Sequence, residues 1–147
     1  MKIIPPIISA LLVSVSSVTA QPADSLLKAT FSLKQRLYHH PPIPFFKGRP
    51  YNLEVVVDIP GDSLETVSIF LKTDRMSSYQ EIPLTPYRGR YLFRYDPEEY
   101  PGDVVSYFLV AAARGFRLYA IPLDKSGKIA PFTIHPLKPV KYYEPPE

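Results

Sequence analysis

Apolar and polar residues alternate along five short runs of this chain, and proline or glycine lies between most of them. The runs cover residues 51–59, 66–71, 90–95, 103–113 and 116–121. Alternation with a period of two predicts β-strands that bury one face. Shorter runs at residues 79–82 and 131–134 predict an edge strand and a last strand. About seven antiparallel strands separated by turns are typical of an all-β sandwich.

The N-terminal stretch, residues 21–36, has two interpretations. Apolar side chains occupy alternate positions at Leu27, Ala29, Phe31 and Leu33, which favours a strand. Alternatively, Asp24 caps a helix that continues toward Leu37. We favour the strand. The prolines of residues 41–44 then predict an extended connector, because proline has no N–H group for a sheet ladder.

The two ends of the chain predict its domain organisation. Residues 1–20 resemble a cleavable signal peptide, with Lys2 at the start, a short apolar stretch and small residues before position 21. A retained anchor is the alternative. We expect an N-terminal extension over residues 21–36, a β-sandwich over residues 37–136 and a proline-rich tail over residues 137–147.

The segment from residue 89 to residue 113 resembles a known architecture. It combines Gly89 and Tyr91, the turn Pro101-Gly102, and Tyr107 four residues before Ala111, and Pro131, Phe132 and Ile134 follow later in the chain. Over residues 37–136 this pattern is similar to exported bacterial immunoglobulin-like and fibronectin type III-like modules. The resemblance implies a fold and not a function. It leaves Tyr107 either as a tyrosine-corner residue or as an ordinary core residue.

Composition narrows the function classes. The net charge is only +3, and the densest basic group, Arg88, Arg90 and Arg94, is interrupted by Tyr91, Leu92 and Phe93, so we expect no nucleic-acid binding. The chain has no cysteine, which means that an exported domain must stand without disulfides. No second apolar stretch approaches about 18 residues, so we expect no transmembrane segment after the leader and a periplasmic or extracellular location.

Candidate catalytic and metal-binding residues are sparse. The chain lacks cysteine and a Gly-x-Ser-x-Gly motif, and its three histidines are His39, His40 and His135. The adjacent His39 and His40 point to opposite faces of an extended chain, which disfavours a shared metal. We therefore expect a non-enzymatic protein with no cofactor and no metal.

The run at residues 103–113 is apolar on both faces. Its inward set is expected to be Val105, Tyr107, Leu109 and Ala111. Its outward set includes Phe108 and Val110, to which the neighbouring strands are expected to add Phe70 and Tyr119. Large apolar patches usually have a partner. Either the N-terminal segment covers this patch with Leu27, Phe31 and Leu33, or a protein partner or second copy does. The second possibility predicts a protein-interaction face formed by Phe70, Phe108, Val110 and Tyr119, in a module of protein interaction or envelope structure.

Tyrosine abundance suggests a rival function. The chain holds 11 tyrosines and no tryptophan. A carbohydrate-binding module would stack sugar rings of a polysaccharide on loop and tail tyrosines, for which the candidates are Tyr87, Tyr100, Tyr142 and Tyr143. Tyrosine is also a favoured strand residue and needs no ligand to explain it.

Overall fold

The computed structural model describes residues 23–139 and residue 145. These residues form one short helix, α1 (Ala23–Lys28), and nine β-strands. The strands are β1 (Leu37–Tyr38), β2 (Tyr51–Val57), β3 (Leu64–Thr73), β4 (Gln80–Pro83), β5 (Thr85–Tyr87), β6 (Arg90–Tyr95), β7 (Val105–Ala113), β8 (Arg117–Ile121) and β9 (Phe132–Ile134).

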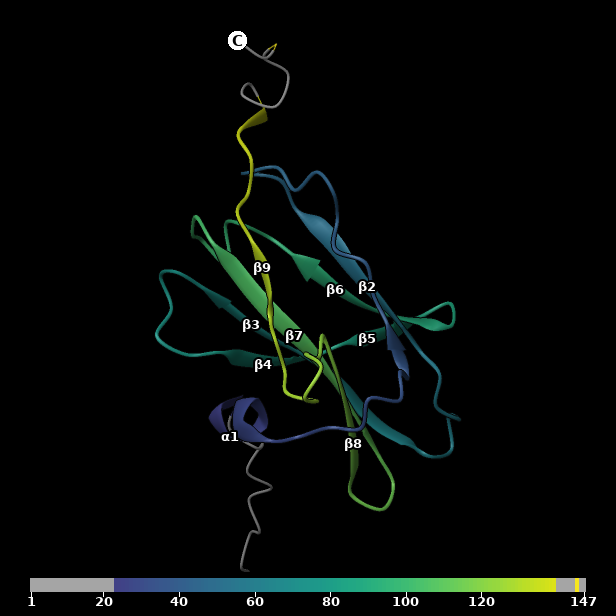
Figure 1. Ribbon diagram of the computed structural model, residues 1–147. Helices are drawn as coiled ribbons and strands as arrows, with labels where there is room; N and C mark the ends of the chain where they lie inside the picture. The colour runs from purple at the N-terminus through teal and green to yellow at the C-terminus, as the bar shows by residue number, and fades with distance from the viewer. Residues whose placement is uncertain (1–22, 140–144, 146–147) are drawn as a thin grey trace, which may run out of the picture.

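The strands form two antiparallel sheets that pack face to face (Figure 1). One sheet has the order β1-β2-β6-β5, and the other has the order β4-β3-β7-β8, with β9 also paired to β7. The predicted all-β sandwich is confirmed, and the strand order is that of seven-stranded immunoglobulin-like sandwiches with two strands, β4 and β9, added to the second sheet. The described part of the chain holds nine strands where about seven were expected, because the short β1 and β5 had no alternation to reveal them.

A two-residue turn connects β5 to β6 as a β-hairpin. Tyr87 pairs with Arg90, so only Arg88 and Gly89 connect the strands. Both connecting residues have positive φ, at 49° and 77° respectively. Two positive φ angles are the signature of a type I′ turn, whose twist matches that of a hairpin. This turn makes a strand of three residues possible despite Pro86.

The inner core lies between the two sheets. The predicted inward set of β7 is confirmed: Val105, Tyr107, Leu109 and Ala111 are all buried there. They face Leu53 and Val55 of β2 and Phe93 and Tyr95 of β6, among other side chains. The alternation of apolar and polar residues in the sequence predicts this core, because each of these strands directs every second side chain inward.

A second, outer core lies on the opposite face of the β3–β7–β8 sheet. Its buried members come from the N-terminal segment, from three strands and from the loop before β9: Leu26, Phe31, Phe70, Phe108, Val110, Ala120 and Ile129. Phe70 and Phe108 are opposite one another in the register, and their rings stack with centroids 4.8 Å apart. Within the described residues, the N-terminal segment is therefore what covers this face (Figure 1).

The strand predicted for this segment is wrong. Residues 23–28 form α1, with Asp24 in its first turn and Lys28 in its last, which complements the helix dipole. A helix of six residues does not persist alone, so packing of Leu26 and Phe31 on the sheet holds the segment in place. Phe31 covers the patch as expected and Leu27 is half-buried, whereas Leu33 is 63 % exposed and takes no part.

One backbone contact fixes the segment to the loop between β8 and β9. The N–H of Phe31 donates to the carbonyl oxygen of Gly127 at 2.8 Å. Gly127 has a φ of +83°, and a Cβ at this position would lie 2.6 Å from the carbonyl oxygen of Phe31. The carboxylate of Asp124 shapes the same loop by accepting hydrogen bonds from Ser126 and Lys128. The cover therefore needs glycine at position 127.

Both termini of the chain extend beyond what the structure describes. The predicted signal peptide lies outside the described residues, as does most of the proline-rich tail. The predicted tail was expected to begin at residue 137, but Leu137 still belongs to the folded part, because it pairs with Phe46 in a parallel bridge. No helix in the described ranges is long and apolar enough to cross a membrane.

Candidate functional site

The structure corrects the predicted protein-interaction face. Phe70, Phe108 and Val110 do share one face of the sheet, but it is the face under the N-terminal segment. Phe108 has no exposed surface, and Phe70 and Val110 are also buried. These three side chains are core residues in the described chain and offer no surface to a partner.

Tyr119 lies on the other face. It pairs with Ala111, whose side chain points into the inner core, and Tyr119 packs against that core. Its neighbours Leu118 and Ala120 are the β8 residues that face outward. The expected grouping of Tyr119 with Phe108 is wrong because Tyr119 pairs with the inward-facing Ala111, and residues paired across antiparallel strands lie on the same face of a sheet.

The loop tyrosines of the rival interpretation do not gather either. Tyr100 is buried, with its ring 5.8 Å from that of Phe93 in the inner core. Tyr87 is half exposed at the β5–β6 turn, where the guanidinium of Arg88 lies over its ring. Tyr142 and Tyr143 lie outside the described residues. Only Tyr87 among the described candidates presents a ring to solvent.

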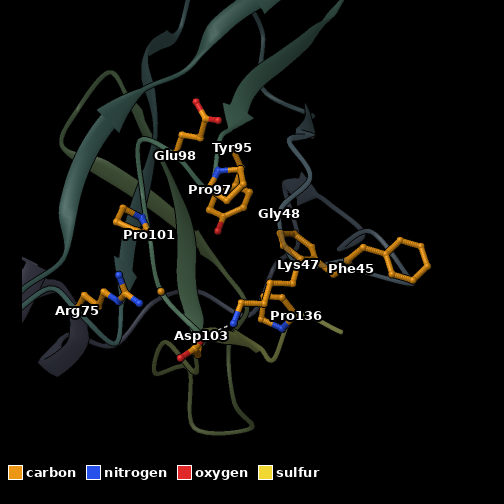
Figure 2. A pocket seen from close by; sticks show the side chains of 12 residues that line it. Phe45, Lys47, Gly48, Arg75, Tyr95, Pro97, Glu98, Pro101, Asp103 and Pro136 are labelled. Atoms are coloured by element: carbon orange, nitrogen blue, oxygen red, sulfur yellow. Dashed lines mark hydrogen bonds and ion pairs between the residues drawn. The ribbon is translucent and has the colours of Figure 1, made fainter. Parts of the chain in front are cut away.

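A pocket of about 320 Å³ lies at the end of the sandwich where β7 begins (Figure 2). It is bounded by the segment before β2, the loop after β3, the β6–β7 loop and the chain after β9. Aromatic rings and prolines supply its apolar lining: Phe45, Phe46, Tyr95, Pro97, Pro101 and Pro136. Charged side chains at Lys47, Arg75, Glu98 and Asp103 complete it. We call it the end pocket.

The β6–β7 loop is pinned to the end of β3. The hydroxyl of Thr73 donates to the carbonyl oxygen of Pro101 at 2.9 Å. The carboxylate of Asp74 accepts the backbone N–H groups of Asp103 and Val104 at 2.8 and 3.2 Å. Gly102 fits between these contacts because it has no side chain; a Cβ there would lie 2.5 Å from the Asp74 carboxylate. The turn Pro101-Gly102 thus places one wall of the end pocket rigidly.

Aromatic packing holds the opposite wall. The ring of Phe45 lies 4.4 Å from that of Tyr51 and 5.3 Å from that of Tyr95, centroid to centroid. The hydroxyl of Tyr51 accepts the N–H of Phe46 at 2.7 Å. Leu137 adds two backbone hydrogen bonds, to Phe45 and Lys47. The segment before β2 is therefore fixed by side chains and backbone together.

An ion pair lies at the mouth of the end pocket. The ammonium group of Lys47 is 2.5 Å from the carboxylate of Asp103. Figure 2 shows the two side chains pointing toward one another. This hydrogen bond, together with the nearby charges of Lys47 and Arg75, lowers the pKa of Asp103 below its ordinary value. Both groups remain exposed, so the pair orders the mouth and contributes little to stability. Asp103 stays ionised and does not act as a proton donor near neutral pH.

The lining of the end pocket is apolar with a charged rim. It includes no serine, threonine, cysteine or histidine. Apolar walls with a few charged groups at the rim are typical of a site that holds a side chain or small group by contact. Sequence reasoning missed this site because its lining comes from four separate parts of the chain, residues 45–48, residue 75, residues 95–103 and residue 136, which share no spacing.

His39 links the two sheets beside a different cavity. A carbonyl oxygen can only accept, so Nδ1 of His39 donates to the backbone oxygen of Glu54 at 2.6 Å. The hydroxyl of Tyr107 then donates to Nε2 at 2.7 Å. Burial lowers the pKa of His39 and raises that of Tyr107. Tyr107 is thus a core residue bonded to a side chain from another element, and not a tyrosine corner.

The histidines do not assemble a metal site. His40 and His135 are exposed, while His39 is half-buried and engaged. Among the described residues, no three histidine, cysteine, aspartate or glutamate side chains are placed to hold one metal ion. The role of His39 in this part of the chain is to join β2 and β7.

Comparisons with known proteins add no family. The chain matches no protein-family model and no curated protein.

Proposed function

We propose that this chain is an exported, non-enzymatic binding module that holds a side chain of a protein partner in the end pocket. The observation that carries the proposal is the combination of fixed aromatic and proline walls with a charged rim. Partner proteins are commonly anchored by one or two side chains that enter such a pocket. Export rests on the leader-like residues 1–20.

The position of the pocket supports this proposal over the face inferred from the sequence. Phe108 and its neighbours are occupied by the chain's own N-terminal segment. The end pocket, in contrast, opens to solvent through exposed side chains such as Lys47, Glu98 and Pro101. Its walls are pinned by the hydrogen bonds of Thr73 and Asp74, so the walls would lose little conformational freedom when a partner binds.

Site-specific photo-crosslinking in the intact cell envelope tests the proposal. A photoreactive residue at Glu98, on the rim, should give a protein adduct that the same residue at Thr85 does not give. Thr85 is exposed on the edge strand β5 and is absent from the lining of the end pocket. Adding Pro101→Trp, which places a large ring in the lining, should remove the Glu98 adduct. Equal adducts from both positions, or none, would contradict the proposal.

A carbohydrate-binding module remains the rival, and Tyr87 is the described residue that supports it. The rings of Phe45, Phe46 and Tyr95 are buried in the pocket wall, whereas sugar stacking needs an exposed ring face. Affinity electrophoresis through gels containing polysaccharide separates the two. Retardation that Tyr87→Ala abolishes and Pro101→Trp leaves unchanged would favour the rival.

A further inference from the structure

Phe116 is a fully exposed aromatic residue at the tip of the β7–β8 hairpin. Its relative exposure is 103 %, the highest of the large hydrophobic side chains in the described chain. Its φ is 58°, and that of Gly115 before it is 79°. A bulky residue with positive φ is a rare and strained arrangement, of the kind that concentrates at functional positions. Neither burial nor turn geometry explains a phenylalanine here.

The hairpin presents this ring in a fixed direction. Ala113 and Arg117 pair at its base, and Nε of Arg117 donates to the carbonyl oxygen of Arg114 at 3.2 Å. The N–H of Arg114 donates to the carbonyl oxygen of Ser63, which ties the hairpin to the β2–β3 turn. The tip is therefore a supported projection, visible beyond the body of the sandwich in Figure 1.

We call the exposed Phe116 side chain the knob. The knob and the end pocket lie at opposite ends of β7. Asp103 of the pocket precedes β7, and Phe116 follows it. A strand of nine residues spans about 30 Å, so no copy can place its own Phe116 in its own pocket. A second copy can.

The two ends are complementary in size and charge. A cavity of about 150 Å³ accommodates benzene, so the end pocket, at about 320 Å³, has room for one phenyl ring. The hairpin tip carries Arg114 and Arg117 and no acid. The β6–β7 loop, residues 96–104, carries four carboxylates and no basic residue. The two cations in the pocket lining, Lys47 and Arg75, both act on Asp103, which leaves Glu98 to face an incoming arginine.

We infer that Phe116 of one copy inserts into the end pocket of the next, so that copies of this chain associate head to tail. The inference rests on the proposed function of the end pocket and names its partner as a second copy. Because each bound copy keeps one free knob or one free pocket, further copies can add at either end, and the contact produces open chains or closed rings larger than a dimer. Such chains fit a structural role in an envelope.

Sedimentation velocity of the purified full chain over a wide range of concentrations tests this inference. The weight-average mass should rise with concentration without stopping at the dimer, and added salt should weaken the rise. Phe116→Asn keeps a residue that tolerates positive φ while it removes the ring. It should weaken association about tenfold or more, as expected when the burial of a phenylalanine is lost. Leu33→Ser, at another exposed apolar residue, is the matched control and should change nothing.

Mixing two variants tests the direction of the contact. Phe116→Asn has a pocket but no knob, and Pro101→Trp has a knob but a filled pocket. Each alone should be monomeric, and a mixture should form dimers that grow no further. A mixture that stays monomeric, or a wild type that stops at a symmetric dimer, would overturn the head-to-tail contact. Urea melts establish that both variants fold.

Two further outcomes separate this inference from its alternatives. If Glu98 still crosslinks to another protein when Phe116 is Asn, the pocket binds a partner but not a second copy, so the inference fails and the proposed function stands. If the chain stays monomeric in solution but binds phosphatidylglycerol–phosphatidylethanolamine vesicles through Phe116, the knob inserts into lipid and the inference is overturned. A wild type that is monomeric throughout, with no vesicle binding, also overturns it.

Discussion

The two faces of the β3–β7–β8 sheet are both buried, but they are buried in different ways. The inner face packs against a whole sheet, with Val55 of β2 and Tyr95 of β6 among its partners. The outer face packs against a six-residue helix, the extended chain to Phe31 and a loop around Ile129. The inner core is made by regular elements that support one another. The outer core depends on a few side chains of a segment that has little structure of its own.

This difference shows how one strand can serve two cores. In β7, Tyr107 and Leu109 point inward while Phe108 and Val110 point outward, so that apolar residues occupy both faces. An outward-facing row of apolar side chains this large usually needs a cover. Here the cover is a short segment that contributes few buried side chains, so the outer core should open more easily than the inner core.

Removing the cover should have the largest effect. Deletion of residues 21–36 removes Leu26 and Phe31 and exposes Phe70, Phe108 and Val110. Loss of two buried side chains costs roughly 3–6 kcal/mol of unfolding free energy at about 1.5–3 kcal/mol each. The truncated chain should bind a hydrophobic dye and self-associate, whereas the inner core keeps its β-sheet circular dichroism. A truncated chain that shows no dye binding would mean that the outer face is not held by this segment.

Single core substitutions compare the two faces directly. Tyr107→Ala in the inner core and Phe108→Ala in the outer core should each destabilise by roughly 3–5 kcal/mol, since both side chains have no exposed surface. Urea denaturation measures both, with Phe116→Ala as the exposed aromatic control. A cost at Phe108 close to that of Phe116 would show that the outer face is solvated in solution.

Gly127→Ala tests the backbone hydrogen bond between Phe31 of the cover and the loop that joins β8 to β9. Alanine at this position combines an unfavourable φ with a Cβ 2.6 Å from the Phe31 carbonyl oxygen, so we expect a loss of about 1–3 kcal/mol. Gly115 has a similar φ of +79° but no atom near its missing Cβ. Gly115→Ala therefore measures only the cost of placing alanine at a positive φ, which is about 1 kcal/mol of unfolding free energy. Hydrogen exchange of the Phe31 amide should accelerate in the first variant only.

The smallest expected effect is a pH dependence of the inner core. Burial lowers the pKa of His39 below its ordinary value of 6.5, with a smaller contribution from His40. The unfolded chain therefore binds a proton that the folded chain does not, so the free energy of unfolding falls as the pH drops from 6.5 through the folded pKa. His39→Gln should reduce the change of the urea midpoint between pH 7.5 and pH 5.5, and His135→Gln should leave that change as it is in the wild type. The lowered pKa values of Asp103 and Asp124 affect the free energy of unfolding only at lower pH, below the ordinary aspartate pKa of 3.8.

The sequence predicts the sandwich well where side chains alternate over a long run. The run at residues 90–95 matches β6, and most of the runs at 51–59 and 103–113 match β2 and β7. It fails for β1 and β5, which have two and three residues and are set by pairing with longer neighbours. For residues 23–28 the sequence left a strand and a helix capped by Asp24 open, and the favoured strand is wrong. Most of the alternating apolar residues lie after Lys28, where the helix ends, so the alternation does not describe α1.

The candidate site was beyond the reach of sequence reasoning. Phe70 and Phe108 were recognised as an apolar face, but the sequence offered two covers for it and no way to choose. The end pocket depends on contacts between Phe45, Tyr95 and the Pro101-Gly102 turn, which four separate segments bring together. Pairing at Phe46 and Leu137 closes that end, and isolated bridges leave no periodic signal. Phe116 was visible, but only its exposure and φ distinguish it from the other aromatics.

The Phe31–Gly127 hydrogen bond has a consequence for how this chain is made. Phe31 leaves the ribosome long before Gly127, so the two cannot meet until the strands from β1 to β8 have all emerged. Until then the stacked pair Phe70 and Phe108 lacks its lid even if the sheets have already formed. Loop closure over so long a separation is slow, and exposed apolar surface during that delay invites association with other chains. The cover therefore docks only after the β8–β9 loop has been made, and until then the outer face is the surface that a chaperone would need to protect.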